Sequence, residues 1–159
     1  MESEARHLFT MNLAYCCAEA TTMFAELSPL AYQELLDGFA SQYPLTRPAL
    51  GPSLVDVPSA YIPVMLRHCY ELGSETRMSQ TLAEIDRDWG PNVASDFNAA
   101  LASYASSIVL RIAEVTSSSR EGVLRDLMQR TRTELWSSCS EWPSTAVSDR
   151  LAAQRGAHG

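Results

Sequence analysis

The sequence predicts a single all-helical domain, and three observations lead to that prediction. Apolar residues recur at the three- and four-residue steps of a helix along most of the chain. No segment of useful length alternates as a strand does, and no repeat of fixed period is visible. The 159 residues are enough to enclose one hydrophobic core. We therefore expect one domain over residues 1–159, with a frayed tail at residues 155–159.

Composition and charge favour a folded cytoplasmic protein. Hydrophobic residues make up 46% of the chain and charged residues 19%, as in globular proteins. The net charge is -7 and there is no lysine, which argues against binding to nucleic acid or to anionic membranes. Residues 1–4 are acidic where a secretory signal would be basic. The uncharged stretch 98–110 is shorter than the roughly 20 residues of a membrane span, so we expect none.

Two helices are predicted before the one long loop. Ser28 is suited to cap the second of them, which begins with Pro29 and ends near Tyr43. Prolines at positions 44, 48, 52 and 58 then predict a surface loop. The first helix covers residues 3–26, because one face collects six apolar or small residues: Phe9, Leu13, Cys16, Ala20, Met23 and Leu27.

Two shorter helices are predicted after the loop. The helix over residues 59–73 has Pro63 in its first turn and ends at Gly73. The helix over residues 74–87 follows directly, and Trp89 continues its apolar stripe. The inner faces of the two helices comprise Ile62, Met65, Leu66, Cys69 and Leu72 in the first, and Met78, Leu82 and Ile85 in the second.

Residues 91–115 are predicted to form a buried central helix. The middle of this segment is apolar or small on all sides and has no charged face, which indicates a helix surrounded by other helices. Its alanines and serines would allow neighbouring helices to approach closely. The volume of the core would come from its larger side chains, which are Val93, Phe97, Leu101, Tyr104, Ile108 and Ile112.

The last third of the chain predicts two more helices. Ser118 and Glu121 have the spacing of a capping box, and Ser144 can cap a final helix that carries Val147 and Leu151. Trp136 and Trp142 bracket the segment between these helices. The inward residues of the first of the two would be Val123, Leu124, Leu127, Met128 and Leu135.

No arrangement of side chains in the sequence supports an enzyme, a cofactor or a metal site. The three histidines are scattered, and no Cys/His pair has the spacing of a zinc site. His68 and Cys69 are adjacent, but neighbours on a helix point about 100° apart and cannot act as a catalytic pair. The four cysteines are expected as reduced thiols. We therefore expect a binding protein.

The order of the helices and two short motifs resemble the Bcl-2 family of apoptosis regulators. The tripeptide Asp88-Trp89-Gly90 precedes the predicted central helix where the family's first homology motif reads Asn-Trp-Gly-Arg. The pair Trp136 and Trp142 is similar to the family's second motif, although it lacks the Gly-Gly. The resemblance implies a Bcl-2-like bundle of about seven or eight helices around a buried central helix. The chain is most similar to a short viral anti-apoptotic homologue without a tail anchor, which suppresses death of the host cell.

Two segments compete for the family's third homology motif. Residues 66–72 resemble its Leu-x-x-x-Gly-Asp core, with Tyr70 and Glu71 in place of glycine and aspartate, but they lie close to Trp89. Residues 29–43 have the more usual separation from Trp89. The second assignment is slightly favoured.

The resemblance implies a groove that sequesters the BH3 helix of pro-apoptotic Bcl-2 proteins. Such a helix places apolar anchors in pockets and pairs one acidic residue with a basic partner. The protein would be cytoplasmic and would associate with mitochondria through its partners. Trp89, Leu101, Tyr104 and Ile108 would be structural core. The implied walls are Tyr61, Met65, Cys69 and Leu72 on one side and Met78, Leu82 and Ile85 on the other, with Gly90, Val93, Ala94 and Phe97 as the floor.

Two substitutions in the first motif predict weak or narrow ligand binding. Pro91 stands where the family has the arginine that pairs with the ligand's aspartate. Asp88 beside it adds repulsion on the order of 1 kcal/mol, unless Arg67, Arg77 or Arg87 moves in.

Two other interpretations remain open at the level of sequence. One is a homodimer in which a second copy occupies the groove, or a Bcl-2 fold that serves inflammatory signalling. The other is a pro-apoptotic member that permeabilises membranes, which the lack of a tail anchor and of a cationic surface disfavours.

Overall fold

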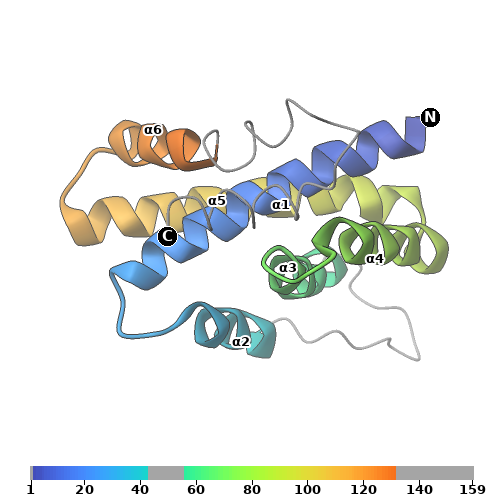
Figure 1. Cartoon of the computed structure of the whole chain (residues 1–159), viewed down its shortest axis with the longest axis horizontal. Helices are drawn as coiled ribbons and strands as arrows, with labels where there is room; N and C mark the ends of the chain where they lie inside the picture. Colours follow the sequence, from blue (N-terminus) through green and yellow to red (C-terminus); the bar gives the residue numbers. More distant parts are fainter. Residues whose placement is uncertain (1, 43–55, 132–159) are drawn as a thin grey trace.

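The computed structural model describes residues 2–42 and 56–131, and this part of the chain contains six helices and no strand (Figure 1). The all-helical prediction is confirmed for these residues. Several predicted features lie outside these residues: positions 44–55 of the predicted loop 44–58, Leu135, the Trp136 and Trp142 segment, the helix after Ser144 and the tail at residues 155–159. The helices are α1 (Glu2–Glu26), α2 (Tyr32–Gln42), α3 (Asp56–His68), α4 (Ser74–Trp89), α5 (Pro91–Thr116) and α6 (Arg120–Thr131).

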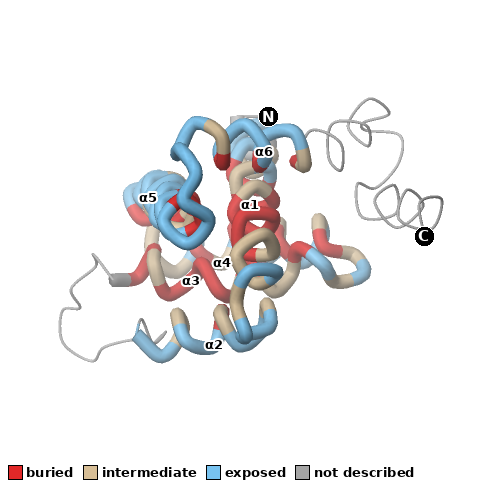
Figure 2. The backbone as a smooth tube through the Cα atoms, turned by 90° about the vertical axis from the view of Figure 1, so that its left-hand side faces the viewer, coloured by how far each residue is buried: buried red, intermediate tan, exposed pale blue. Residues whose placement is uncertain are grey.

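The first helix, α1, is the most enclosed element of the described bundle. It contacts each of the other five helices, and its most extensive contact is with α5. All five residues from Cys17 to Thr21 are buried, so this part of α1 has no solvent face (Figure 2). The stripe from Phe9 to Leu27 predicted one buried face instead. The prediction was wrong at its two ends, because the side chains of Phe9 and Leu27 are exposed.

The predicted central helix, α5, has an exposed face. Its buried residues form one stripe that includes Val93, Phe97, Leu101, Tyr104 and Ile112. The opposite side faces solvent (Figure 2). Alanine and serine lose little by facing water, so an uncharged run of them does not require burial on all sides. The prediction that no part of this helix faces solvent was therefore wrong, and its exposed residues include Ala99, Ala102, Ser103, Ser106, Ser107 and Leu110.

By length and composition alone, α5 is apolar enough to cross a membrane. Core helices of water-soluble proteins meet the same criterion, so this property does not assign α5 to a membrane. Asp96, Arg111 and Glu114 place charges on its exposed turns.

Several helix boundaries differ from the predicted ones for identifiable reasons. The hydroxyl of Ser28 accepts a hydrogen bond from the Leu30 amide and so closes a turn, while α2 begins only at Tyr32. The third helix begins three residues earlier than predicted, so Pro58, which was expected in the loop, lies in its first turn and Pro63 lies in its interior. It also ends at His68 and not at Gly73. Ser119, and not Ser118, caps α6, because its hydroxyl accepts a hydrogen bond from the Gly122 amide at 3.0 Å.

The sixth helix packs through a narrower face than its sequence suggested. Val123 and Leu127 are buried against α1 and α5. Leu124 and Met128 were predicted to point inward, but about half of each side chain is exposed. A helix that covers only one edge of a bundle buries a narrow stripe, which explains the difference.

Polar side chains also hold α1 to its neighbours. The carboxylate of Glu19 is buried, accepts a hydrogen bond from the Tyr70 hydroxyl at 3.0 Å, and lies 3.4 Å from the Arg130 guanidinium of α6. The hydroxyls of Thr21 and Tyr104 lie 2.7 Å apart inside the core. Burial raises the pKa of Tyr104 to about 12, so this hydroxyl stays protonated and hydrogen-bonded at neutral pH.

Candidate functional site at the α3–α4 seam

The predicted walls of the groove lie on α3, on the tight turn that follows it and on α4. The Glu71 amide donates to the His68 carbonyl at 3.0 Å, and Gly73 follows with φ of 72°. This left-handed conformation suits glycine and lets the chain reverse directly into Ser74. Both helices then pack against α5 and against each other. We call the contact between α3 and α4 the α3–α4 seam.

The apolar residues predicted for the groove lie together, but they are packed in the core. Leu72 is the exception, because it lies in the turn after α3 and is 83% exposed. Of the remaining positions, Asp88, Gly90 and Ala94 are half-buried and Pro91 is exposed. The seam is therefore closed in this structure. The residues that fill the seam and the adjoining face of α5 are all at most 4% exposed and comprise Tyr61, Met65, Cys69, Met78, Leu82, Ile85, Val93 and Phe97.

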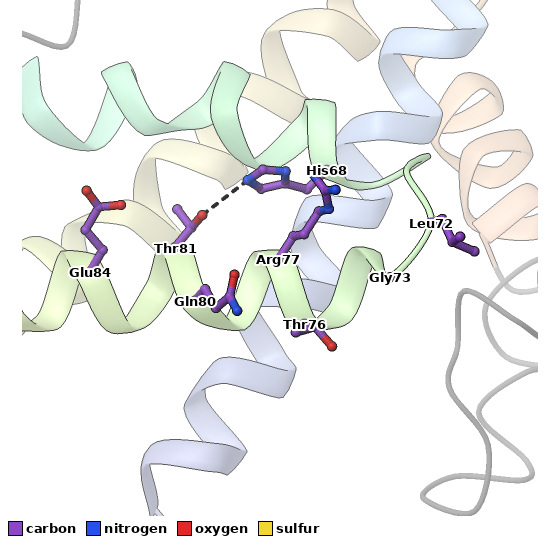
Figure 3. Close-up of a pocket in the computed structure, with 8 residues that line it drawn as sticks. All are labelled: His68, Leu72, Gly73, Thr76, Arg77, Gln80, Thr81 and Glu84. Atoms are coloured by element: carbon purple, nitrogen blue, oxygen red, sulfur yellow. Dashed lines mark hydrogen bonds between the residues drawn. The ribbon is translucent and has the colours of Figure 1, made fainter.

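A hydrogen bond and a sulfur contact join the two sides of the seam. The ring of His68 lies 3.2 Å from the Thr81 hydroxyl on the opposite helix (Figure 3). Inside the core the buried Cys69 thiol lies 3.9 Å from the buried Met78 sulfur. Burial raises the pKa of Cys69 well above its usual value, so the thiol is neutral and behaves as an apolar residue.

The Trp89-Gly90 junction links the seam to α5. Trp89 is half-buried, is the last residue of α4, and donates its indole N–H to the Tyr61 hydroxyl of α3 at 3.2 Å. Gly90 has φ of 88° and ψ of 173°, a conformation that residues with a side chain rarely adopt. Its amide donates to the Asp86 carbonyl and so ends α4, and Pro91 begins α5. The junction thus fixes the angle between α4 and α5 and holds α3 by a hydrogen bond.

Each of the three arginines near the predicted groove has an acidic partner. The Arg87 guanidinium lies 3.0 Å from the Asp88 carboxylate and offsets its negative charge, as one of the arginines named in the sequence analysis would have to do. Arg67 pairs with Asp37 of α2. Arg77 pairs with Glu71 at 2.8 Å.

An open cavity of about 620 Å³ lies over the outer side of the seam (Figure 3). It is larger than the cavity of about 420 Å³ beside α6 and that of about 440 Å³ beside Met11. Leu72 and Glu84 lie at its two ends, and Arg77 extends toward His68 between them (Figure 3). The lining residues are His68, Leu72, Gly73, Thr76, Arg77, Gln80, Thr81 and Glu84.

The sequence analysis anticipated two members of this lining, Leu72 as a groove residue and Arg77 as a cation that could move toward Asp88, and it assigned no binding role to the others. A signal was present, because Arg77, Gln80 and Glu84 follow helical steps of three and four residues beside the apolar stripe of Met78 and Leu82. Such a polar stripe becomes a site only when another helix closes it into a cavity. The position of α3 supplies that closure and is not visible in the sequence.

Comparison with protein-family models, with curated proteins and with solved structures found no match. Among residues 2–42 and 56–131, no group of three or more His, Cys, Asp or Glu side chains could hold a metal ion. The accessible surface over the seam offers charged and polar hydrogen-bonding groups and the exposed Leu72, while the apolar residues of the seam are packed inside.

Proposed function

We propose that this protein is an anti-apoptotic binding protein of the Bcl-2 type. In this proposal it sequesters the BH3 helix of pro-apoptotic proteins along the α3–α4 seam, with narrow ligand selectivity. The observation that carries the proposal is the apolar interior of the seam, which contains Met65, Cys69 and Met78 and ends at the Trp89-Gly90 junction. The resemblance in the order of helices and in that junction supports the same proposal.

The side chains of the seam are suited to accept a foreign helix. Methionine is unbranched and polarizable, so Met65 and Met78 can repack around different apolar partners. The contacts that hold the seam on its outer side are weak, since they consist of the His68 hydrogen bond to Thr81 and the solvent-exposed ion pair of Arg77 with Glu71. An amphipathic helix could therefore replace contacts between α3 and α4 with contacts of its own.

The closed seam explains why narrow selectivity is expected. If a ligand binds only an open form of the seam, its affinity falls in proportion to the population of that form. Each 1.4 kcal/mol in the free energy of opening lowers the affinity about tenfold. Electrostatics adds to this cost. Pro91 supplies no positive charge at the start of α5, and Arg67, Arg77 and Arg87 already have acidic partners in the described structure. Only ligands with well-matched apolar anchors should bind.

Calorimetric titration with a panel of BH3 peptides tests the proposal. We expect saturable one-to-one binding of a minority of the panel, because the apolar anchors must compensate for the opening of the seam. Peptides with each anchor replaced by alanine serve as controls and should not bind. Failure of every peptide to bind would contradict the proposed function, and tight binding of the whole panel would contradict the narrow selectivity. A stable dimer in light scattering, without peptide binding, would favour a homodimeric interaction protein instead.

A further inference from the structure

The cavity over the seam contains a cation that is placed to meet a ligand. Arg67 is directed to Asp37 on α2, and Arg87 lies beside Asp88 and does not line the cavity. Arg77 lines the cavity, and its side chain is 56% exposed. Of these three arginines, Arg77 is therefore the one that a helix lying over the seam would approach.

The present partner of Arg77 leaves room for a second carboxylate. One terminal nitrogen of its guanidinium lies 2.8 Å from Glu71, and that same carboxylate oxygen also lies 3.4 Å from the His68 ring. A guanidinium has five N–H donors, so a single carboxylate oxygen does not exhaust its capacity. Thr76 and Gln80 border the cavity beside Arg77 and add uncharged donors. An acidic side chain entering the cavity would find donors on several sides.

We infer that Arg77 receives the acidic residue of the partner helix and so takes the role that the missing arginine at position 91 would have had. This inference rests on the proposed function, because it concerns the same ligand and the same seam. It moves the charge contact from the start of α5 to the first turns of α4.

The opposite end of the cavity specifies a second feature of the ligand. Glu84 lies seven residues after Arg77 on α4, a separation of two helical turns or about 10.5 Å. The cavity therefore has a positive and a negative region along its length, with the exposed Leu72 beyond the positive one (Figure 3). A complementary helix carries an apolar residue, then an acidic residue, and then a basic residue about two turns further along its length.

Charge reversal on both partners tests the inference. With the BH3 peptide that binds best to the unaltered protein, Arg77→Glu should lower affinity about tenfold, and reversing the peptide's aspartate to lysine should restore most of the loss. Glu71→Gln should act in the opposite direction and raise affinity severalfold, because it frees Arg77 from its internal partner. Arg111→Glu on the exposed side of α5 makes the same change in net charge and should leave affinity unchanged.

The outcomes separate this inference from the function on which it rests. Peptide binding that is insensitive to Arg77→Glu and Glu71→Gln would overturn the role of Arg77 and leave the proposed function standing. Absence of binding to the unaltered protein would overturn both. If Arg77→Glu lowers the melting temperature, Arg77→Gln gives the same test without a reversed charge. In that case, changing the peptide's aspartate to lysine should weaken binding to the unaltered protein and should not weaken binding to Arg77→Gln.

Discussion

Replacing Phe97 with alanine should lower the free energy of unfolding by about 3–5 kcal/mol. The Phe97 side chain is fully buried and belongs to the core cluster where α3, α4 and α5 meet α1. Its removal takes away the apolar surface of the ring and leaves a cavity that close-packed neighbours fill only in part. Urea denaturation followed by circular dichroism measures the change.

The matched control for Phe97 lies on the other face of the same helix. Leu110 of α5 is 44% exposed, so Leu110→Ala should cost less than about 1 kcal/mol. If Phe97→Ala does not fold, Phe97→Leu keeps most of the volume and should still be less stable than Leu110→Ala. Equal effects of the two alanine variants would contradict the assignment of one buried and one exposed face to α5.

Replacing Gly90 with alanine should destabilise the protein by about 1–3 kcal/mol. Apart from Gly90 and its two chain neighbours, no heavy atom lies within 4 Å of a Cβ placed at this position, so the cost does not come from a clash with another part of the bundle. It comes from the backbone, because φ of 88° with ψ of 173° is essentially restricted to glycine. The variant would either keep this strain or relax the angle between α4 and α5, which would disturb the seam as well.

Gly38 provides the control for the Gly90 substitution. It lies within α2 and its Cβ position is likewise free of contacts. Because its conformation is helical, Gly38→Ala should stabilise the protein by about 0.5–1 kcal/mol. Thermal denaturation of the two variants should therefore give shifts of opposite sign. A neutral Gly90→Ala would show that the junction does not require a positive φ.

The sequence was informative about single helices and less so about their surroundings. Apolar spacing placed α1 and α5 within one residue of their observed ends, and Gly73 marked the start of α4, whereas the end of α4 was predicted at Arg87 and lies at Trp89. Spacing also describes a stripe, but it does not say how many neighbours cover the rest of a helix. A helix rich in alanine, serine and cysteine packs equally well at the centre or at an edge, so α1 and α5 could not be ranked by burial from the sequence.

The candidate site shows the same division between local and tertiary information. The apolar residues of the seam were found because they repeat on one side of each helix, and the structure does bring Met65, Cys69 and Met78 together. Whether they line an open groove or fill a closed core depends on the distance between α3 and α4, which is a property of the whole bundle. The pairing of Arg87 with Asp88 and of Arg77 with Glu71 depends on side-chain direction in the same way.

The central claim is that the α3–α4 seam takes up the partner helix, and methyl NMR of the protein labelled at its methionines tests it most directly. Met65 and Met78 are fully buried in the seam, while Met23 of α1 and Met128 of α6 lie in other parts of the bundle. On titration with a BH3 peptide we expect the resonances of Met65 and Met78 to shift to saturation and those of Met23 and Met128 to stay in place. Unchanged resonances of Met65 and Met78 at saturating peptide would contradict the account.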